Sequence, residues 1–260
     1  MANKRKPPER PSQDIWQVES LRFTAFPTPD AQIEEPTWWK DLIGEPAERK
    51  VSAPKRRILQ EEGAFSGGKL MLSIQPLRID WTLSPSPSQQ QELDALPTIG
   101  LVSDSLRVFS ELIERWIQSE SFPPVKRIAL GTILLHPVEN GKQGYEQLSA
   151  YLPAIQLDTE HSSDFSYQIN RPRASVSGLA DLKINRVSRW SVALMRAGSI
   201  AVGPQTVESV MGREHFACRL ELDINTAADF AGSLPRERLP AILHELASFG
   251  EEIVREGDVP

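Results

Sequence analysis

Two long amphipathic segments, each following several strand-length apolar runs, constrain the fold of this chain more than any other feature. In residues 103–120 the apolar positions recur every three or four residues, which is typical of a helix with one buried stripe. The residues of this stripe are Val102, Leu106, Phe109, Ile113 and Trp116. Residues 236–255 repeat the spacing. Each helix must cover another apolar surface, and the preceding runs supply it.

The runs before the two helices follow the same order. The first series is a strand at 18–27, a short helix at 36–44, and strand-like runs at 57–65 and 69–83 that meet at Ser66-Gly67-Gly68. The second series is a strand at 126–137, a helix at 143–153, and strand-like runs at 164–172, 182–195 and 215–225. We therefore predict an α+β fold of two strand–helix–antiparallel strands–long helix units, with helices packed on one face of each sheet.

The expected boundaries follow from composition. Residues 14–124 form the first unit and residues 125–260 the second, either as separate units or as one continuous domain. Residues 1–13, MANKRKPPERPSQ, are rich in proline and cations. Such a segment buries too little apolar surface to order itself, so we expect a disordered basic tail.

Composition excludes several classes of protein. Of the 260 residues, 40% are hydrophobic and 25% charged, and the net charge is −6, so a chain built to coat nucleic acid is not expected. Cys218 is the one cysteine, which excludes a disulfide within the chain and disfavours a zinc site. No apolar run reaches the roughly 18 residues of a membrane helix. We expect a cytoplasmic protein with no cofactor, no metal and no membrane partner.

Catalytic motifs are weak. Residues 63–70 fit G-x-x-x-x-G-K, but Leu70 stands where a phosphate-binding loop needs a hydroxyl, and strand-like sequence follows instead of a helix. This segment is predicted to be a hairpin turn. A metal-nuclease pattern can be drawn from Asp164, Asp181 and Lys183, which lie on or near strand-like runs. We expect a protein that is not an enzyme.

A basic region is the most informative segment. Ile-Asn-Arg occurs twice, at 169–171 and 184–186, on runs that are expected to pair as neighbouring strands. The polar residues of this region are Asn170, Arg171, Arg173, Lys183, Asn185, Arg186 and Arg189. Arginine forks bind carboxylates and phosphates alike, so the region is a candidate partner- or anion-binding surface. Alternatively, its arginines line a sheet edge and pair with the chain's own acids.

Adjacent tryptophans, Trp38 and Trp39, are a second candidate interface. On a short helix they cannot both face one core, so at least one should be partly exposed or covered by another element. Tryptophan is enriched in the residues that dominate binding energy at protein interfaces.

The strand at 18–27 (VESLRFTAFP), the strand at 126–137 (KRIALGTILLHP) and the strand ending LELDIN before the final helix resemble an uncharacterised, sporadically distributed bacterial family of soluble α+β proteins. That resemblance implies a bacterial cytoplasmic protein encoded beside genes of a mobile-element or phage-defence cluster. It supplies no activity.

These observations lead to three hypotheses. The first is a non-enzymatic interaction or accessory subunit of a multi-protein system, with another protein as its partner. The second is a nucleic-acid-binding protein or metal-dependent nuclease that uses the basic Ile-Asn-Arg region. The third is a small-molecule sensor with a pocket between the two units.

Overall fold

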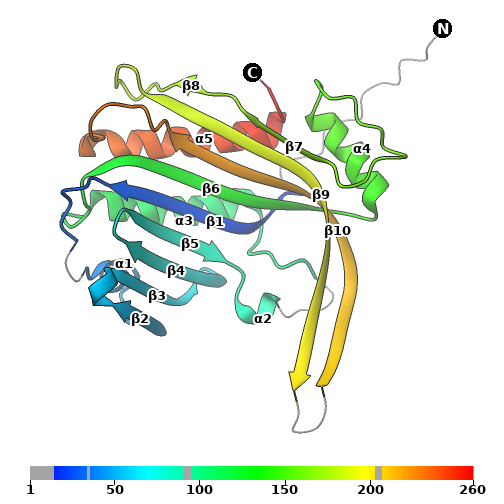
Figure 1. Ribbon diagram of the computed structural model, residues 1–260, viewed down its shortest axis with the longest axis horizontal. Coiled ribbons are helices and arrows are strands. Elements are labelled where there is room, and N and C mark those ends of the chain that lie inside the picture. The colour runs from blue at the N-terminus through cyan, green and yellow to red at the C-terminus, as the bar shows by residue number, and fades with distance from the viewer. Residues whose placement is uncertain (1–14, 34–35, 91–94, 203–206, 260) are drawn as a thin grey trace.

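A computed structural model describes residues 15–33, 36–90, 95–202 and 207–259, and for residues 197–202 and 207–211 it describes the backbone alone (Figure 1). The predicted tail at 1–13 lies outside these residues. In the first half the elements are β1 (Gln17–Pro27), α1 (Trp38–Ile43), β2 (Arg49–Ala53), β3 (Ile58–Phe65), β4 (Gly68–Gln75), β5 (Arg78–Ser84), α2 (Pro87–Gln90) and α3 (Val102–Gln118). In the second half they are β6 (Val125–Val138), α4 (Gly141–Tyr151), β7 (Ser166–Asn170), β8 (Arg173–Ala174), β9 (Lys183–Val202), β10 (Val207–Thr226) and α5 (Leu239–Glu256).

The described strands form one ten-stranded sheet. Its order is β2-β3-β4-β5-β1-β6-β10-β9-β7, with β8 paired to β9. Every pairing is antiparallel. The first strand of each half lies at the centre, where Phe23 of β1 is opposite Leu130 of β6. The predicted mixture of helices and antiparallel strands is confirmed, and the strands of both halves join one sheet instead of forming one sheet each.

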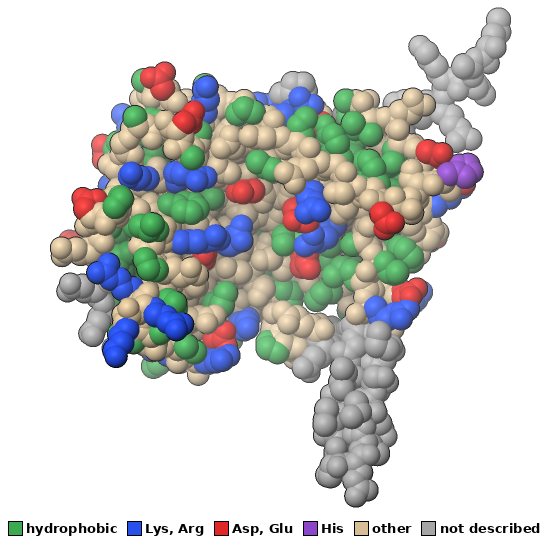
Figure 2. Space-filling view, in the orientation of Figure 1, with side chains coloured by type: hydrophobic (Ala, Val, Ile, Leu, Met, Phe, Trp, Pro, Cys, Tyr) green, Lys and Arg blue, Asp and Glu red, His purple; other side chains and the backbone are tan. Residues whose placement is uncertain are grey.

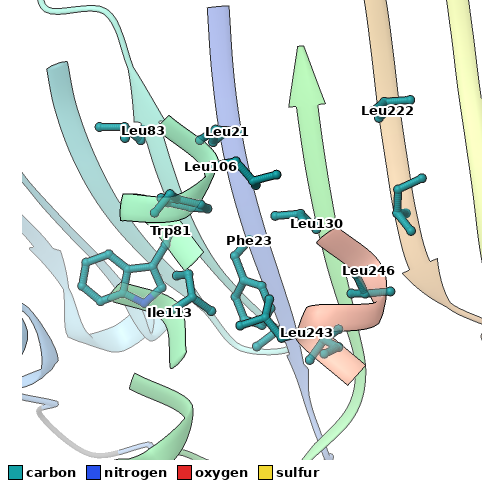
Figure 3. Packing of buried hydrophobic residues seen from close by; sticks show 14 of the residues in the cluster. Leu21, Phe23, Trp81, Leu83, Leu106, Ile113, Leu130, Leu222, Leu243 and Leu246 are labelled. Carbon is teal, nitrogen blue, oxygen red and sulfur yellow. The ribbon is translucent and has the colours of Figure 1, made fainter. Parts of the chain in front are cut away.

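The hydrophobic core lies between this sheet and the helices α3 and α5, which also contact each other (Figure 1). Register places most of the buried apolar side chains of β5, β1, β6 and β10 on one side of the sheet, whereas the hydrogen-bonded pair Thr24 and Asp80 is buried on the other. Figure 3 shows the packing of Leu106 and Ile113 from α3, Leu243 and Leu246 from α5, and Phe23, Trp81, Leu130 and Leu222 from the sheet. We call this the helix side of the sheet, and the opposite side the open face.

Turn chemistry explains where the strands change direction. Ser66 and Gly67 connect β3 to β4 with φ values of 46° and 76°, so the predicted hairpin is confirmed. Gly68 has a different role from the one predicted, because it lies within β4, where a Cβ would come within 2.6 Å of the Ser84 carbonyl oxygen.

Two local predictions differ from the structure. The run at 69–83 is not one strand, since a turn at Pro76 and Leu77 divides it into β4 and β5. Strand β2 was not predicted at all, because its side chains are almost all exposed and show no apolar alternation. None of the helices in the described ranges has the length and apolar character needed to cross a bilayer.

Candidate functional site

The basic Ile-Asn-Arg region is divided between the two faces of the sheet. Arg171, Arg173 and Arg186 lie on the helix side, near the end of α5. Arg171 donates two hydrogen bonds to Asp258, at 2.5 and 2.9 Å. Arg173 makes a two-pronged contact with Glu252, with both distances 2.8 Å. These two arginines therefore tie the β7–β9 end of the sheet to the end of α5.

Arg186 is the most deeply buried member of this cluster, at 1% exposure. Its guanidinium lies 3.3 Å from Glu252 and 5.2 Å from the ring centre of Phe249. Burial lowers the pKa of Arg186, and the nearby Glu252 carboxylate opposes that shift. The Arg171 hydrogen bonds hold the pKa of Asp258 below its ordinary value. Arg171 and Arg173 are partly exposed, but all three arginines are paired with the chain's own acids, so a partner would have to compete with Asp258 and Glu252.

The remaining polar residues of the region lie elsewhere. Asn170 donates to Asn185 at 3.0 Å, and Asn185 donates to Asn225 at 3.0 Å, so the two predicted amides join a row across three strands. Arg189 is exposed on the open face and donates to the Ser166 hydroxyl at 3.2 Å. Lys183 is exposed at the start of β9.

The structure does not bring Asp164, Asp181 and Lys183 together as a metal site. Antiparallel register pairs Ser166, just after Asp164, with Ser191, whereas Asp181 precedes Lys183 at the other end of β9. At about 3.3 Å per residue, the strand between Lys183 and Ser191 spans roughly 25 Å. Across the described parts of the chain, no group of three His, Cys, Asp or Glu side chains is placed to hold a metal ion.

Trp38 and Trp39 are both buried, at 3% and 2% exposure, because different elements cover them. Trp38 packs edge-on against Trp116 of α3 at 5.2 Å and donates to the Ser121 hydroxyl at 3.0 Å. Trp39 stacks on Trp81 of β5 at 6.1 Å. Neither indole offers a broad exposed surface to a partner.

The open face carries charges of both signs. Figure 2 shows rows of Lys and Arg side chains crossing it, with acids between them. A hollow of about 430 Å³ lies near its centre, and Arg22, Arg189, Glu221 and Asp223 are among its lining residues. Its floor includes Gly131, where a Cβ would lie 3.4 Å from the Arg22 guanidinium. Because opposite charges alternate here, the hollow has no strong preference for a ligand of one sign.

The β2 end of the sheet has a different charge pattern. Five exposed cations occur within nine residues, at Arg49, Lys50, Lys55, Arg56 and Arg57. Lys and Arg side chains gather at this corner in Figure 2. We call these residues, together with strand β2, the basic edge.

Few of these cations are neutralised. Arg49 is 70% exposed and lies 3.5 Å from Glu62, an acid that it shares with Lys69. Lys50 pairs with Glu61 at 2.9 Å. Within the described ranges, Lys55, Arg56 and Arg57 form no ion pair. The basic edge therefore carries an excess of positive charge on a chain that is acidic overall.

A cavity of about 740 Å³ lies beside the basic edge, between the sheet and the α1 segment. Its walls are largely apolar and include Trp39, Ala47, Ile58 and Ile74, while Lys50, Ser52 and Arg57 reach it from the basic edge. The buried Trp39 Nε1 and Glu61 Oε2 have no hydrogen-bond partner among the described residues. This volume is in the usual range of ligand and side-chain pockets.

Sequence reasoning missed this site. The five cations are present in the sequence, but the surrounding segment is rich in acids and prolines and has no strand-like apolar pattern. Nothing therefore indicated that they lie at a sheet edge. We found no match to this chain among protein-family models, curated proteins or solved structures. The function is therefore argued from the chain itself.

Proposed function

We propose that this chain is a non-enzymatic interaction protein, an accessory subunit of a multi-protein system, that binds an acidic partner protein at the basic edge. The single observation that carries this proposal is the run of three exposed cations, Lys55, Arg56 and Arg57, that directly follows edge strand β2 and forms no ion pair among the described residues. Charges of one sign on an exposed surface steer and select a partner of the opposite sign.

Contrast with the predicted basic region supports the choice of surface. There, Arg171, Arg173 and Arg186 already hold Asp258 and Glu252. A partner would have to displace these acids. At the basic edge no such displacement is needed for Lys55, Arg56 or Arg57.

A protein partner is favoured over nucleic acid by the kind of surface. Single-stranded nucleic acid is usually held by aromatic platforms as well as cations. Trp39, the aromatic residue beside the basic edge, is buried and already stacked on Trp81. A strand edge with free backbone groups suits a polypeptide.

The test is a pull-down of the tagged full chain from its native host, at low and high salt. We compare the double variant Lys55→Glu and Arg56→Glu with a matched double variant, Lys183→Glu and Arg189→Glu, which makes the same change in charge within the Ile-Asn-Arg region. The proposal expects a stoichiometric protein partner to be lost from the first variant and kept by the second.

Two results would contradict the proposal. Loss of the partner from the second variant alone would move the interface to the Ile-Asn-Arg region. Recovery of nucleic acid that dissociates as salt rises, with no protein partner, would favour phosphate binding instead.

A further inference from the structure

We infer that the partner contributes an extended segment that pairs with β2 as an additional strand and places an apolar side chain in the adjacent cavity. The inference rests on the proposed function, and it specifies the chemistry of the partner. Strand addition of this kind gains affinity from backbone hydrogen bonds and specificity from pockets for alternate side chains.

Strand β2 has one edge that no described strand covers. Among the described strands, β2 stands at the end of the sheet order and pairs with β3 alone. Within the described residues, Arg49–Ala53 make no backbone hydrogen bond outside that pairing. The outward N–H and C=O groups of β2 are therefore available to another chain.

The two faces of β2 determine which side chains an added strand would contact. Lys50 is opposite Glu61 and Ser52 is opposite Leu59, and all four of these residues line the cavity. Arg49 and Val51 point to the open face, because successive side chains alternate. An added strand would thus direct every second side chain to the cavity side and the others to the Arg49 side.

Charge decides which side chains belong on each side. On the cavity side of β2, Lys50 is paired with Glu61 at 2.9 Å and lies beside apolar walls, so this side favours an apolar side chain. Arg49 on the other side, and Lys55 and Arg56 in the following turn, keep their charge exposed. The expected segment alternates apolar and acidic residues.

A second copy of this chain does not fit the same edge. Pairing β2 with β2 of another copy would bring two basic edges together, and like charges on paired strands are destabilising. The occupant is therefore a different polypeptide of opposite charge.

The polar residues that line the cavity refine the apolar side chain. Lys50 and Ser52 line it together with apolar residues. A phenol hydroxyl both donates and accepts, so a tyrosine supplies an apolar ring for the walls and a polar group for the Lys50 and Ser52 side. We expect tyrosine in the partner to bind better than alanine at the same position.

The probe is the fluorescein-labelled peptide Glu-Val-Glu-Tyr-Glu-Val-Glu, measured by fluorescence anisotropy with the full chain at low salt. Substituting Ser52→Phe fills space on the cavity side, and we expect binding to weaken by about tenfold. The matched variant, Leu194→Phe, places the same ring at an exposed position of β9, away from β2 in the sheet order, and should leave peptide binding within about twofold of wild type. Phenylalanine is favourable in strands, so neither variant should unfold the chain.

A second arm tests the backbone hydrogen bonds. Two methylated frames of the peptide are compared, one N-methylated at the odd-numbered residues and one at the even-numbered residues. In a paired strand, alternate N–H groups face the same neighbour, so only one of these frames loses the N–H groups that face β2. We expect one methylated frame to lose binding and the other to keep it. Replacing the tyrosine by alanine should also weaken binding by about tenfold.

Several outcomes would overturn the inference. These are absence of peptide binding, equal tolerance of both methylated frames, equal effects of the two phenylalanine variants, and stronger binding of a 20-nucleotide oligothymidine at the same edge. If the peptide fails while the pull-down partner still depends on Lys55 and Arg56, strand addition is wrong and the proposed function stands. If that partner is also unaffected by the charge reversal, both proposals fail.

Discussion

The two ends of the sheet use the same type of residue in opposite ways. At the β7–β9 end, three arginines face the helix side, and Asp258 and Glu252 from the end of the chain meet them. At the β2 end, a comparable group of cations lies on and just after an edge strand. Glu62 and Glu61 pair with Arg49 and Lys50, and among the described residues Lys55, Arg56 and Arg57 form no ion pair. The first group holds the fold together, and the second remains exposed.

The difference teaches that a cluster of cations indicates a binding surface only when the fold leaves some of its cations without a paired acid. Both clusters have a high density of Lys and Arg in the sequence. Their environments differ because the end of α5 reaches one and not the other. Charge-removing substitutions at the two ends should therefore have different effects on stability and on binding.

The largest effect is expected for Glu252→Gln. This change removes the charge that pairs with Arg173 and with the buried Arg186. Leaving a buried arginine unpaired is strongly destabilising, so we expect the free energy of unfolding to fall by about 3 kcal/mol. Urea unfolding of the full chain, followed by tryptophan fluorescence, measures it.

Glu62→Gln is the matched change at the basic edge. Glu62 contacts Arg49 and Lys69 at 3.5 and 3.6 Å, and both cations are partly exposed. Exposed pairs of this kind contribute little, so the expected loss is below about 1 kcal/mol. Equal losses for the two variants would contradict the contrast between the ends.

A second, smaller effect concerns pH. The hydrogen bonds from Arg171, and one from the Tyr167 hydroxyl, hold the pKa of Asp258 below its ordinary value of 3.8. Because the pKa is lower in the folded state, the stabilisation is present above about pH 3.8 and is lost as the pH falls through the folded value. Asp258→Asn should cost about 2 kcal/mol at pH 7, and the difference from wild type should shrink only below about pH 3.8.

Urea midpoints from pH 7 down to pH 3 measure this effect. Asp223→Asn serves as the control, since Asp223 is exposed on the open face and accepts a hydrogen bond from Asn225 instead of an arginine. A difference between Asp258→Asn and wild type that stays constant with pH would show that the Arg171–Asp258 pair has no such role.

Much of the fold was predictable because its elements bury one regular face. The apolar spacing from Leu106 to Trp116 specifies helix α3 locally, and Ser66-Gly67 specifies the hairpin turn locally. Strand β2 does not, because Lys50, Val51 and Ser52 are exposed and its place depends on pairing with β3. Local sequence carries no signal for a strand that is specified by its neighbour.

The candidate site was less predictable, for the same reason. Arg186 and Lys55 both lie in segments rich in Lys and Arg. Arg186 is paired with Glu252, which is 66 residues further along the chain, whereas Lys55 has no ion pair among the described residues. Whether a cation is paired depends on such long-range contacts. The Ile-Asn-Arg region was therefore singled out, and the basic edge was not.

Cys218 offers a reporter for the second half of the chain. Burial raises the pKa of its thiol to about 12, and its Sγ lies 3.4 Å from the Gly144 carbonyl oxygen. At pH 8 the native thiol should therefore react with a disulfide reagent far more slowly than the thiol of the unfolded chain. We expect Glu252→Gln to accelerate this labelling and Glu62→Gln to leave it unchanged. Equal acceleration by both would mean that the two ends open together.

The smallest effect is expected at Arg57, and it separates folding from binding. Arg57 has φ of 52°, a left-handed conformation that costs a side-chain-bearing residue free energy and suits glycine. Arg57→Gly relieves that strain but adds freedom to the unfolded chain, so the net change in stability should be within about 1 kcal/mol.

The same substitution removes one unpaired cation from the basic edge, and partner binding should therefore weaken even though the fold is kept. Arg115→Gly is not a suitable control, because Arg115 lies within α3, where glycine is unfavourable. Arg57→Asn, which also accepts the left-handed conformation without the charge, is the better one. If Arg57→Asn and Arg57→Gly both bind the partner as wild type does, the charge at this turn has no part in recognition. If both weaken binding equally while their urea midpoints match wild type, the guanidinium acts on the partner and not through the backbone, which is what distinguishes this end of the sheet from the other.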